Sequence, residues 1–221
     1  MRSYGQYCGL AKALDVVGDR WTLLIVRELL LRGDCRYTDL KNGLPGIATN
    51  LLADRLRELE HAGLLAREEA PPPVATALFR LTRRGRELEP ALLQLGLWGA
   101  PLLAHPDEND AFCTHWLALP LQHLLVDQAP HRPPVAIEVR TGDEPVTLET
   151  IGGKICLRRR LEKNPDAVLA GPPHLVLGVL TGKLPLADAR SAGLLYEGEP
   201  AILRRIQPAT KSRQALAAKP K

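Results

Sequence analysis

The sequence predicts an α+β fold in two domains, and three observations support it. Apolar residues recur with the period of a helix between residues 9 and 62. Two short strand-like segments, separated by consecutive prolines, follow between residues 65 and 81. Beyond a Pro-containing boundary at residues 101–106 the period changes to alternation, as in Val146–Ile151. We therefore place one domain at residues 1–105, a second at 106–207 and a basic tail, predicted to be disordered, at 208–221.

The first elements are defined by helical periodicity and by residues that break helices. A helix is expected over Gly9–Val17, and Asp19 is a natural N-cap for a second helix that ends at Gly33. Residues 35–37 are expected to be extended. Thr38 is expected to cap a brief helix that runs to Asn42.

The next helix, Ile47–Ala62, follows the turn Gly43–Gly46, and a turn of this kind between short helices is typical of a helix-turn-helix. A two-stranded ribbon is expected at Leu65–Glu69 and Thr76–Leu81, with Pro71–Pro73 at its tip. Thr82 is then expected to cap a helix reaching Trp98. This order of elements is that of a winged helix-turn-helix, in which the second helix of the motif enters a DNA major groove.

A helical wheel divides the Ile47–Ala62 helix into an apolar side and a polar side. The apolar side carries Ile47, Leu51, Leu52, Leu56 and Leu59. Arg55 lies within it, so we expect a structural ion pair with an acid such as Glu28 rather than a DNA contact. Including the residues around the polar side, the expected DNA-binding residues are Arg36, Lys41, Ala48, Thr49, Asn50, Ala53, Arg57 and Arg80. The basic residues would contact phosphates or the minor groove, while Thr49 and Asn50 would contact base edges.

The second domain is predicted to begin with a helix over Asp107–Gln128, bent at Pro120, followed by a linker at Pro130–Pro134. Gly152–Gly153 is a hairpin turn between two strands. The expected strands are Val135–Arg140, Val146–Ile151, Lys154–Arg160, Asp166–Ala170 and Leu194–Glu197, with helices at His174–Thr181 and Leu186–Ala192. They predict a mostly antiparallel five-stranded sheet with helices on one face.

Composition narrows the class of function. The net charge of +4 and the pI of about 9.0 suit a nucleic-acid binder. No signal peptide or membrane span is visible, so a cytoplasmic location without a membrane partner is expected. The four cysteines are scattered, which indicates neither disulfides nor a metal site. No phosphate-binding loop or nucleophile elbow is present, so we expect no enzyme activity and no cofactor.

Several motifs of the first half, taken in order, resemble the HxlR family of bacterial transcription regulators. They are Gly18-Asp19-Arg20-Trp21, Arg27-Glu28-Leu29, Arg36-Tyr37-Thr38-Asp39-Leu40, Leu44-Pro45-Gly46-Ile47, Arg55-Leu56-Arg57-Glu58-Leu59, Gly63-Leu64 and Leu81-Thr82-x-x-Gly85. The resemblance covers about Tyr7 to Leu103. It implies a homodimer, formed through the first and last helices of the domain, that binds a palindromic operator in double-stranded DNA.

Cys8 lies where this family often has Cys-Pro, although Gly9 follows it here. In some members that cysteine senses oxidants. The alternative is a small apolar residue in the dimer interface. Because only Lys12 would lower its pKa, we expect that oxidants do not control DNA binding through Cys8.

The second half resembles the sterol carrier protein family in the order of its elements. It also shares Thr141-Gly142-Asp143, the glycine-containing stretch Leu177–Leu184, and Gly193–Gly198. The resemblance implies an apolar tunnel, which in a regulator would hold a hydrophobic small-molecule effector. The expected lining is Trp116, Leu124, Val139, Leu148, Leu157, Val176 and Leu180. The alternatives are a core filled by its own side chains, or a lipid or small-molecule carrier whose winged helix serves protein contacts.

Overall fold

The computed structural model describes residues 3–69, 76–104, 107, 110–142, 144–158 and 164–208. The chain divides into two compact units, residues 1–99 and 100–221. The predicted prolines at the ribbon tip and the predicted tail beyond Pro208 lie outside the described residues. Among the described residues, no helix combines the length and the apolar character that a membrane crossing requires.

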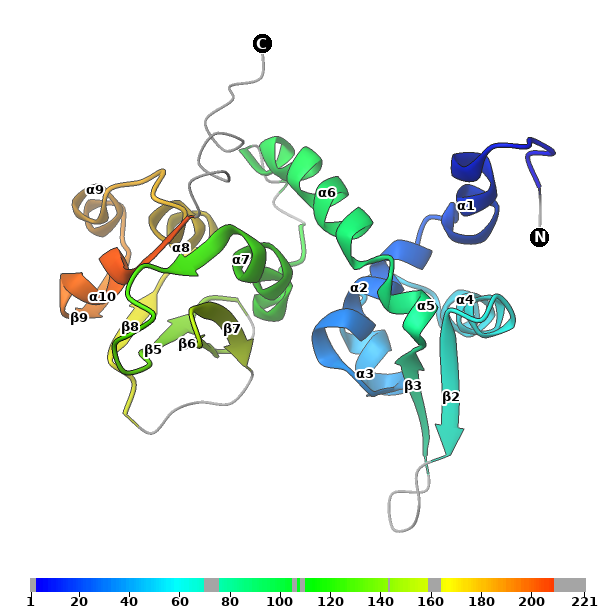
Figure 1. Cartoon of the computed structure of the whole chain (residues 1–221), viewed down its shortest axis with the longest axis horizontal. Coiled ribbons are helices and arrows are strands. Elements are labelled where there is room, and N and C mark those ends of the chain that lie inside the picture. The colour runs from blue at the N-terminus through cyan, green and yellow to red at the C-terminus, as the bar shows by residue number, and fades with distance from the viewer. Residues whose placement is uncertain are drawn as a thin grey trace. The chain divides into compact units, whose positions relative to one another are not determined.

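The first unit is a winged helix-turn-helix, as the sequence predicts (Figure 1). Its three strands pair antiparallel in the order β1-β3-β2. Its elements are α1 (Gly9–Val17), α2 (Thr22–Arg32), β1 (Cys35–Arg36), α3 (Tyr37–Asn42), α4 (Thr49–His61), β2 (Leu65–Glu69), β3 (Ala77–Leu81), α5 (Arg83–Arg86) and α6 (Glu89–Gly99).

The core of this unit lies between α2, α4 and the ribbon. Ile25 of α2, Leu52 and Leu56 of α4, and Phe79 and Leu81 of β3 all belong to one buried cluster. Helix α4 therefore packs the apolar side that its sequence period predicts and leaves the other side outward. The segment between α3 and α4 places Leu44 and Ile47 in the same core.

Two of the predicted helix caps are wrong. Trp21, not Asp19, is the N-cap of α2, and it makes no side-chain cap. Helix α3 begins at Tyr37, where the Asp39 carboxylate accepts a hydrogen bond of 2.9 Å from the backbone N–H of Arg36, so Thr38 is not the cap. Asp19 bonds to Arg55 instead, and at α3 the cap is made by Asp39, a residue after the predicted Thr38.

Thr82 does cap a helix, because its Oγ1 accepts a hydrogen bond of 3.1 Å from the backbone N–H of Gly85. That helix does not run without interruption to Trp98. It ends at Arg86, and α6 starts at Glu89.

The second unit contains two sheets, and the larger confirms the predicted five-stranded, mostly antiparallel sheet. Its strand order is β7-β6-β5-β8-β9, in which β5 and β8 run parallel. The elements are the 3₁₀ helices η1 (Ala100–Ala104) and η2 (Thr114–Leu117), α7 (Ala118–Leu124), β4 (Leu125–Asp127), β5 (Ala136–Arg140), β6 (Val146–Ile151), β7 (Lys154–Arg158), β8 (Ala167–Ala170), α8 (Pro173–Leu180), α9 (Leu186–Ser191), β9 (Leu195–Gly198), α10 (Pro200–Arg205) and β10 (Ile206–Pro208).

The helix expected over residues 107–128 is wrong in extent. Of the described residues in this range, those at 114–124 are helical, as η2 and α7, and β4 follows them directly. Strand β4 pairs antiparallel with β10 in a second, two-stranded sheet. Neither β10 nor α10 was predicted. Strand β4 has its partner about 80 positions along the chain, and so distant a pairing leaves no periodic trace in a short segment.

An ion pair connects this small sheet to its surroundings. The Arg205 guanidinium donates to both carboxylate oxygens of Asp127, at 2.7 and 2.8 Å, and to the Pro133 carbonyl at 2.6 Å. Arg205 belongs to the basic stretch that the sequence shows after Glu199, and the structure makes it an internal residue of the second unit.

Candidate nucleic-acid interface

The turn between α3 and α4 is held by two side chains of α3. The Tyr37 hydroxyl donates a hydrogen bond of 2.6 Å to the carbonyl of Thr49, the first residue of α4. The Lys41 ammonium donates to the carbonyl of Ile47. Both bonds cross the turn, so α3 and α4 keep a fixed mutual position without help from a ligand.

A buried carboxylate lies beneath this turn. Glu28 of α2 is completely buried, and Arg27 and Arg32 each bond to it at 2.9 Å. Gly43 packs directly against it, because a Cβ atom on Gly43 would lie 2.2 Å from Glu28 Oε2. Any larger residue at position 43 would have to displace either the carboxylate or the turn.

Arg55 does not pair with Glu28, so that prediction is wrong. Its guanidinium contacts Asp19, which precedes α2, and Glu58, one turn further along α4. The predicted structural role holds, but the partner differs because Arg27 and Arg32 already neutralise Glu28.

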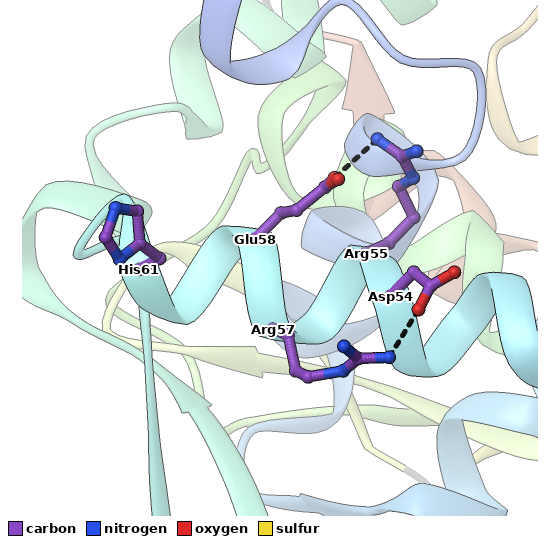
Figure 2. A pocket seen from close by; sticks show the side chains of 5 residues that line it. All are labelled: Asp54, Arg55, Arg57, Glu58 and His61. Carbon is purple, nitrogen blue, oxygen red and sulfur yellow. Dashed lines mark hydrogen bonds and ion pairs between the residues drawn. The ribbon is translucent and has the colours of Figure 1, made fainter. Parts of the chain in front are cut away.

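The outer side of α4 presents the residues expected to read DNA. Thr49 and Asn50 are exposed in the first turn, Ala48 is exposed just before it, and Ala53 is half-buried. Arg57 is exposed one turn after Ala53 and forms an ion pair with Asp54 (Figure 2). The structure therefore brings five of the predicted DNA-binding residues together on one solvent-facing surface.

The other three predicted contacts differ from one another. Arg36 is exposed just before α3. Lys41 is half-buried and uses its ammonium group on the Ile47 carbonyl. Arg80 projects from β3 and pairs with Glu68 of β2 at 2.8 Å. Arg57 and Arg80 are therefore each paired with a carboxylate, of Asp54 and Glu68 respectively.

A shallow depression of about 360 Å³ lies along the second half of α4 (Figure 2). It is lined by Asp54, Arg55, Arg57, Glu58 and His61. All five side chains are charged or carry an imidazole, so the surface suits a polar partner and not an apolar molecule.

Cys8 occupies a setting that side-chain reasoning did not reveal. It is exposed and forms the N-cap of α1. The backbone N–H groups of Ala11 and Leu10, at the start of α1, lower the pKa of its thiol below 9.0, although Cys8 makes no capping hydrogen bond. The sequence-based expectation considered Lys12 alone and overlooked the helix N-terminus, which stabilises a thiolate.

The first unit also exposes apolar side chains that the wheel of α4 could not predict. Helix α6 has no buried residue although it is rich in leucine. Among the residues of this unit that the structure describes, the exposed large apolar side chains are Tyr4, Tyr7, Leu10, Leu14, Leu24, Leu95 and Trp98. The sequence contains an indication of this exposure, because the apolar residues of Glu89–Gly99 are spread around the helix and are not confined to one side.

The residues expected to line an effector pocket mostly lie in the core of the second unit. Leu124 is buried, and Val139, Leu148, Val176 and Leu180 belong to one packed cluster, in which none is more than 1% exposed. Trp116 and Leu157 are half-buried. A second depression, of about 370 Å³, is lined by other residues: Arg140, Thr141, Gly142, Pro145 and Gly171. Among the described residues, no group of three or more His, Cys, Asp or Glu side chains could hold a metal ion.

Comparison with known proteins places this interface among helix-turn-helix regulators. Residues 16–107 match the family model described as HxlR-like helix-turn-helix. The chain is 34% identical over 99 residues to the HTH-type transcriptional regulator sll1512 of Synechocystis sp., which is 45% of this chain and 73% of that protein. It is also 34% identical over 87 residues to the HTH-type transcriptional regulator YvaP of Bacillus subtilis, which is 39% of this chain and 80% of that protein.

Two solved structures give similar coverage. The redox regulator HypR in its oxidised form is 32% identical, covers 45% of this chain and 99% of its own, and has a TM-score of 0.39. The reduced form of the transcriptional regulator YodB from B. subtilis is 26% identical, covers 46% of this chain and 100% of its own, and has a TM-score of 0.40.

Proposed function

Since this chain belongs to the HxlR-like helix-turn-helix family, whose members are transcription regulators and not enzymes, we propose that it acts as a homodimer that recognises a palindromic operator. The observation that carries the proposal is the outer side of α4. Thr49, Asn50 and Arg57 face solvent there, while the inner side of the same helix is locked into the core. A helix held in this way is ready to enter a major groove.

In this proposal Thr49 and Asn50 contact base edges. Both lie in the first turn of α4, the part of a recognition helix that reaches deepest into the groove. An asparagine amide can both donate to and accept from adenine, which gives sequence preference.

Arg36, Arg57 and Arg80 contact phosphates or the minor groove. Lys41 contributes in two ways, because an ammonium group has three donors and only one is needed for the Ile47 carbonyl. These contacts bind all sequences alike and position the protein on the duplex.

The dimer forms through α1 and α6. Large apolar side chains are exposed on both helices, among them Leu10 and Leu14 on α1 and Leu95 and Trp98 on α6. Exposed large apolar side chains that gather on a helix of a monomer often mark an interface. Covering it in a second copy would set the two recognition helices a fixed distance apart.

The test compares wild type with Asn50→Ala on a duplex that wild type selects from a randomised library, and on scrambled DNA. Wild type should prefer the selected duplex, and its affinity should fall steeply with salt. Asn50→Ala should lose about 1–3 kcal/mol of that preference and little affinity for scrambled DNA. Asn164→Ala, an exposed asparagine of the second unit, is the matched control. Equal losses on both DNAs would contradict the assignment of Asn50, and a wild type that selects no duplex would contradict the function.

A hydrophobic effector could enter the second unit only by displacing side chains of its core. Val139, Leu148, Val176 and Leu180 fill the space between sheet and helices with their own side chains. A ligand there would have to separate α7 or α8 from the sheet. It would alter DNA binding only through different affinities for two conformations.

A further inference from the structure

Arg55 and Arg57 lie two positions apart on α4 but serve different surfaces. Figure 2 shows their side chains on opposite sides of the helix. The Arg57 side chain is 73% exposed, whereas that of Arg55 is 18% exposed and contacts Asp19 and Glu58. Both side chains line the depression along α4, but Arg55 is mostly covered by its ion-pair partners whereas Arg57 is open to solvent.

Asp19, one of the two partners of Arg55, belongs to the corner between α1 and α2. This corner comprises Asp19, Arg20 and Trp21. This corner starts two residues after the end of α1 at Val17. It meets the helix-turn-helix in a second place as well, because the Trp21 ring lies 3.9 Å from the position of a Cβ on Gly46, in the turn before α4.

The buried leucines of α4 hold the helix in the core, and Trp21 contacts the turn that precedes it. The ion pair between Asp19 and Arg55 adds a contact to the same corner about two turns further along the helix, and so further restrains the angle between α4 and the α1–α2 corner.

We propose that Arg55 is a positioning residue for DNA binding: by holding Asp19 it fixes α4 relative to α1, and thereby sets the half-site spacing that the dimer accepts. The inference rests on the proposed dimer through α1. In such a dimer the two recognition helices must meet major grooves one helical turn, or a multiple of it, apart. A small rotation of each α4 would change that separation.

A purely structural role is a poor explanation for this pair. Asp19 is largely exposed, with 63% of its side chain accessible, and ion pairs in such settings contribute little to folding. Removing the bond should therefore leave a folded protein whose recognition helices are less well fixed.

The experiment uses the duplex selected by the wild type, together with versions whose half-site spacing is lengthened or shortened by one or two base pairs. Wild type should bind the original spacing best. Arg55→Gln and Asp19→Asn should each bind it about fivefold more weakly and should show a flattened dependence on spacing. The double variant should be no worse than Arg55→Gln alone, because Arg55→Gln already removes the bond to Asp19 together with the bond to Glu58.

Salt dependence separates this role from a phosphate contact. Arg57→Gln, which removes a proposed phosphate contact, should lower the salt slope by about 1, whereas Arg55→Gln should leave it unchanged. Arg83→Gln is the matched control, since it removes an exposed arginine ion pair with Glu87 in the same unit. It should change neither slope nor spacing preference.

Two outcomes would overturn the inference: an unchanged spacing preference in Asp19→Asn and Arg55→Gln, or a salt slope that Arg55→Gln lowers as Arg57→Gln does. Asp19→Asn keeps the test valid even if Arg55→Gln folds poorly, because Asp19 is exposed. If wild type selects no duplex at all, the proposed function fails first and this inference falls with it, which is a different result from a selected duplex with unchanged spacing preference.

Discussion

The two units of the chain differ in how far the apolar side chains of one main element are buried. In the first, α6 buries no residue, and Trp98 remains 75% exposed. In the second, Ile137, Val139, Leu148 and Leu169 from the central strands are completely buried beneath helices. The second unit thus buries the apolar side chains of its central strands, although Ile151 and Leu195 of the same sheet stay exposed. The exposed apolar side chains of α6 are the physical reason to expect a dimer through the first unit.

The largest effect should come from the core of the second unit. Leu148→Ala removes a completely buried side chain at the centre of the sheet and should lower the free energy of unfolding by about 2–5 kcal/mol. Leu95→Ala, on the exposed α6, should cost far less in a protein diluted to monomer. Urea unfolding measures both variants. Equal losses of unfolding free energy in the two variants would contradict the difference in burial between the two units.

Breaking the ion pair between Asp127 and Arg205 should be nearly as costly. Both side chains are buried, and Asp127→Asn leaves the guanidinium without its charge partner, so a loss of about 3 kcal/mol is expected at neutral pH. The pair of Arg158 and Glu149 offers a control, because its arginine is 54% exposed and Glu149→Gln should cost under about 1 kcal/mol.

The same pair makes an acid-dependent contribution to stability. The Arg205 guanidinium holds the pKa of the Asp127 carboxyl below its ordinary 3.8, so folding favours the ionised form. The contribution is therefore complete above about pH 4 and is lost as the pH falls further, towards the folded-state pKa. The stability difference between wild type and Asp127→Asn should be constant from neutral pH down to that point and shrink below it. A difference that shrank on raising the pH would contradict this assignment.

Trp98→Ala should act on assembly more than on folding. A large exposed aromatic residue in the proposed interface is expected to contribute about 2 kcal/mol or more to association. Analytical ultracentrifugation over a dilution series should show the dimer dissociating at higher concentration, while the helical content of the monomer is kept. Trp116→Ala, in the second unit, should leave the association constant unchanged. An association constant that Trp98→Ala does not change would contradict an interface that includes α6.

The smallest effect concerns the thiol of Cys8. Because N–H groups at the start of α1 lower its pKa below 9.0, its rate of alkylation should rise with pH at lower values than for an ordinary thiol. Cys35 is the internal contrast, since burial raises the pKa of its thiol to about 12. Mass spectrometry of iodoacetamide-treated protein over a pH series should find Cys8 modified first. Equal rates for the two cysteines would show that the helix N-terminus has no influence.

Local pattern was enough to predict most of the first unit. The apolar period of α4, the turn at Gly43–Gly46 and the Thr82 cap are all short-range features, so neighbouring residues carry the information. The same holds for the strands around Gly152–Gly153 in the second unit. The outer residues of α4 could likewise be identified, because a helix that buries one side must expose the other.

Tertiary structure decided which partner the charged side chains and the distant strands would take. The sequence offers Arg55 several acids, and only packing shows that Arg27 and Arg32 occupy Glu28 and leave Asp19 for Arg55. In the same way, β4 and β10 form a sheet only because folding brings residues about 80 positions apart together. Sequence by itself determined where the helices, the wing and the outward side of α4 lie, since those follow from local period. The angle at which α4 is held depends on contacts distant in the chain, and only the folded structure contains them.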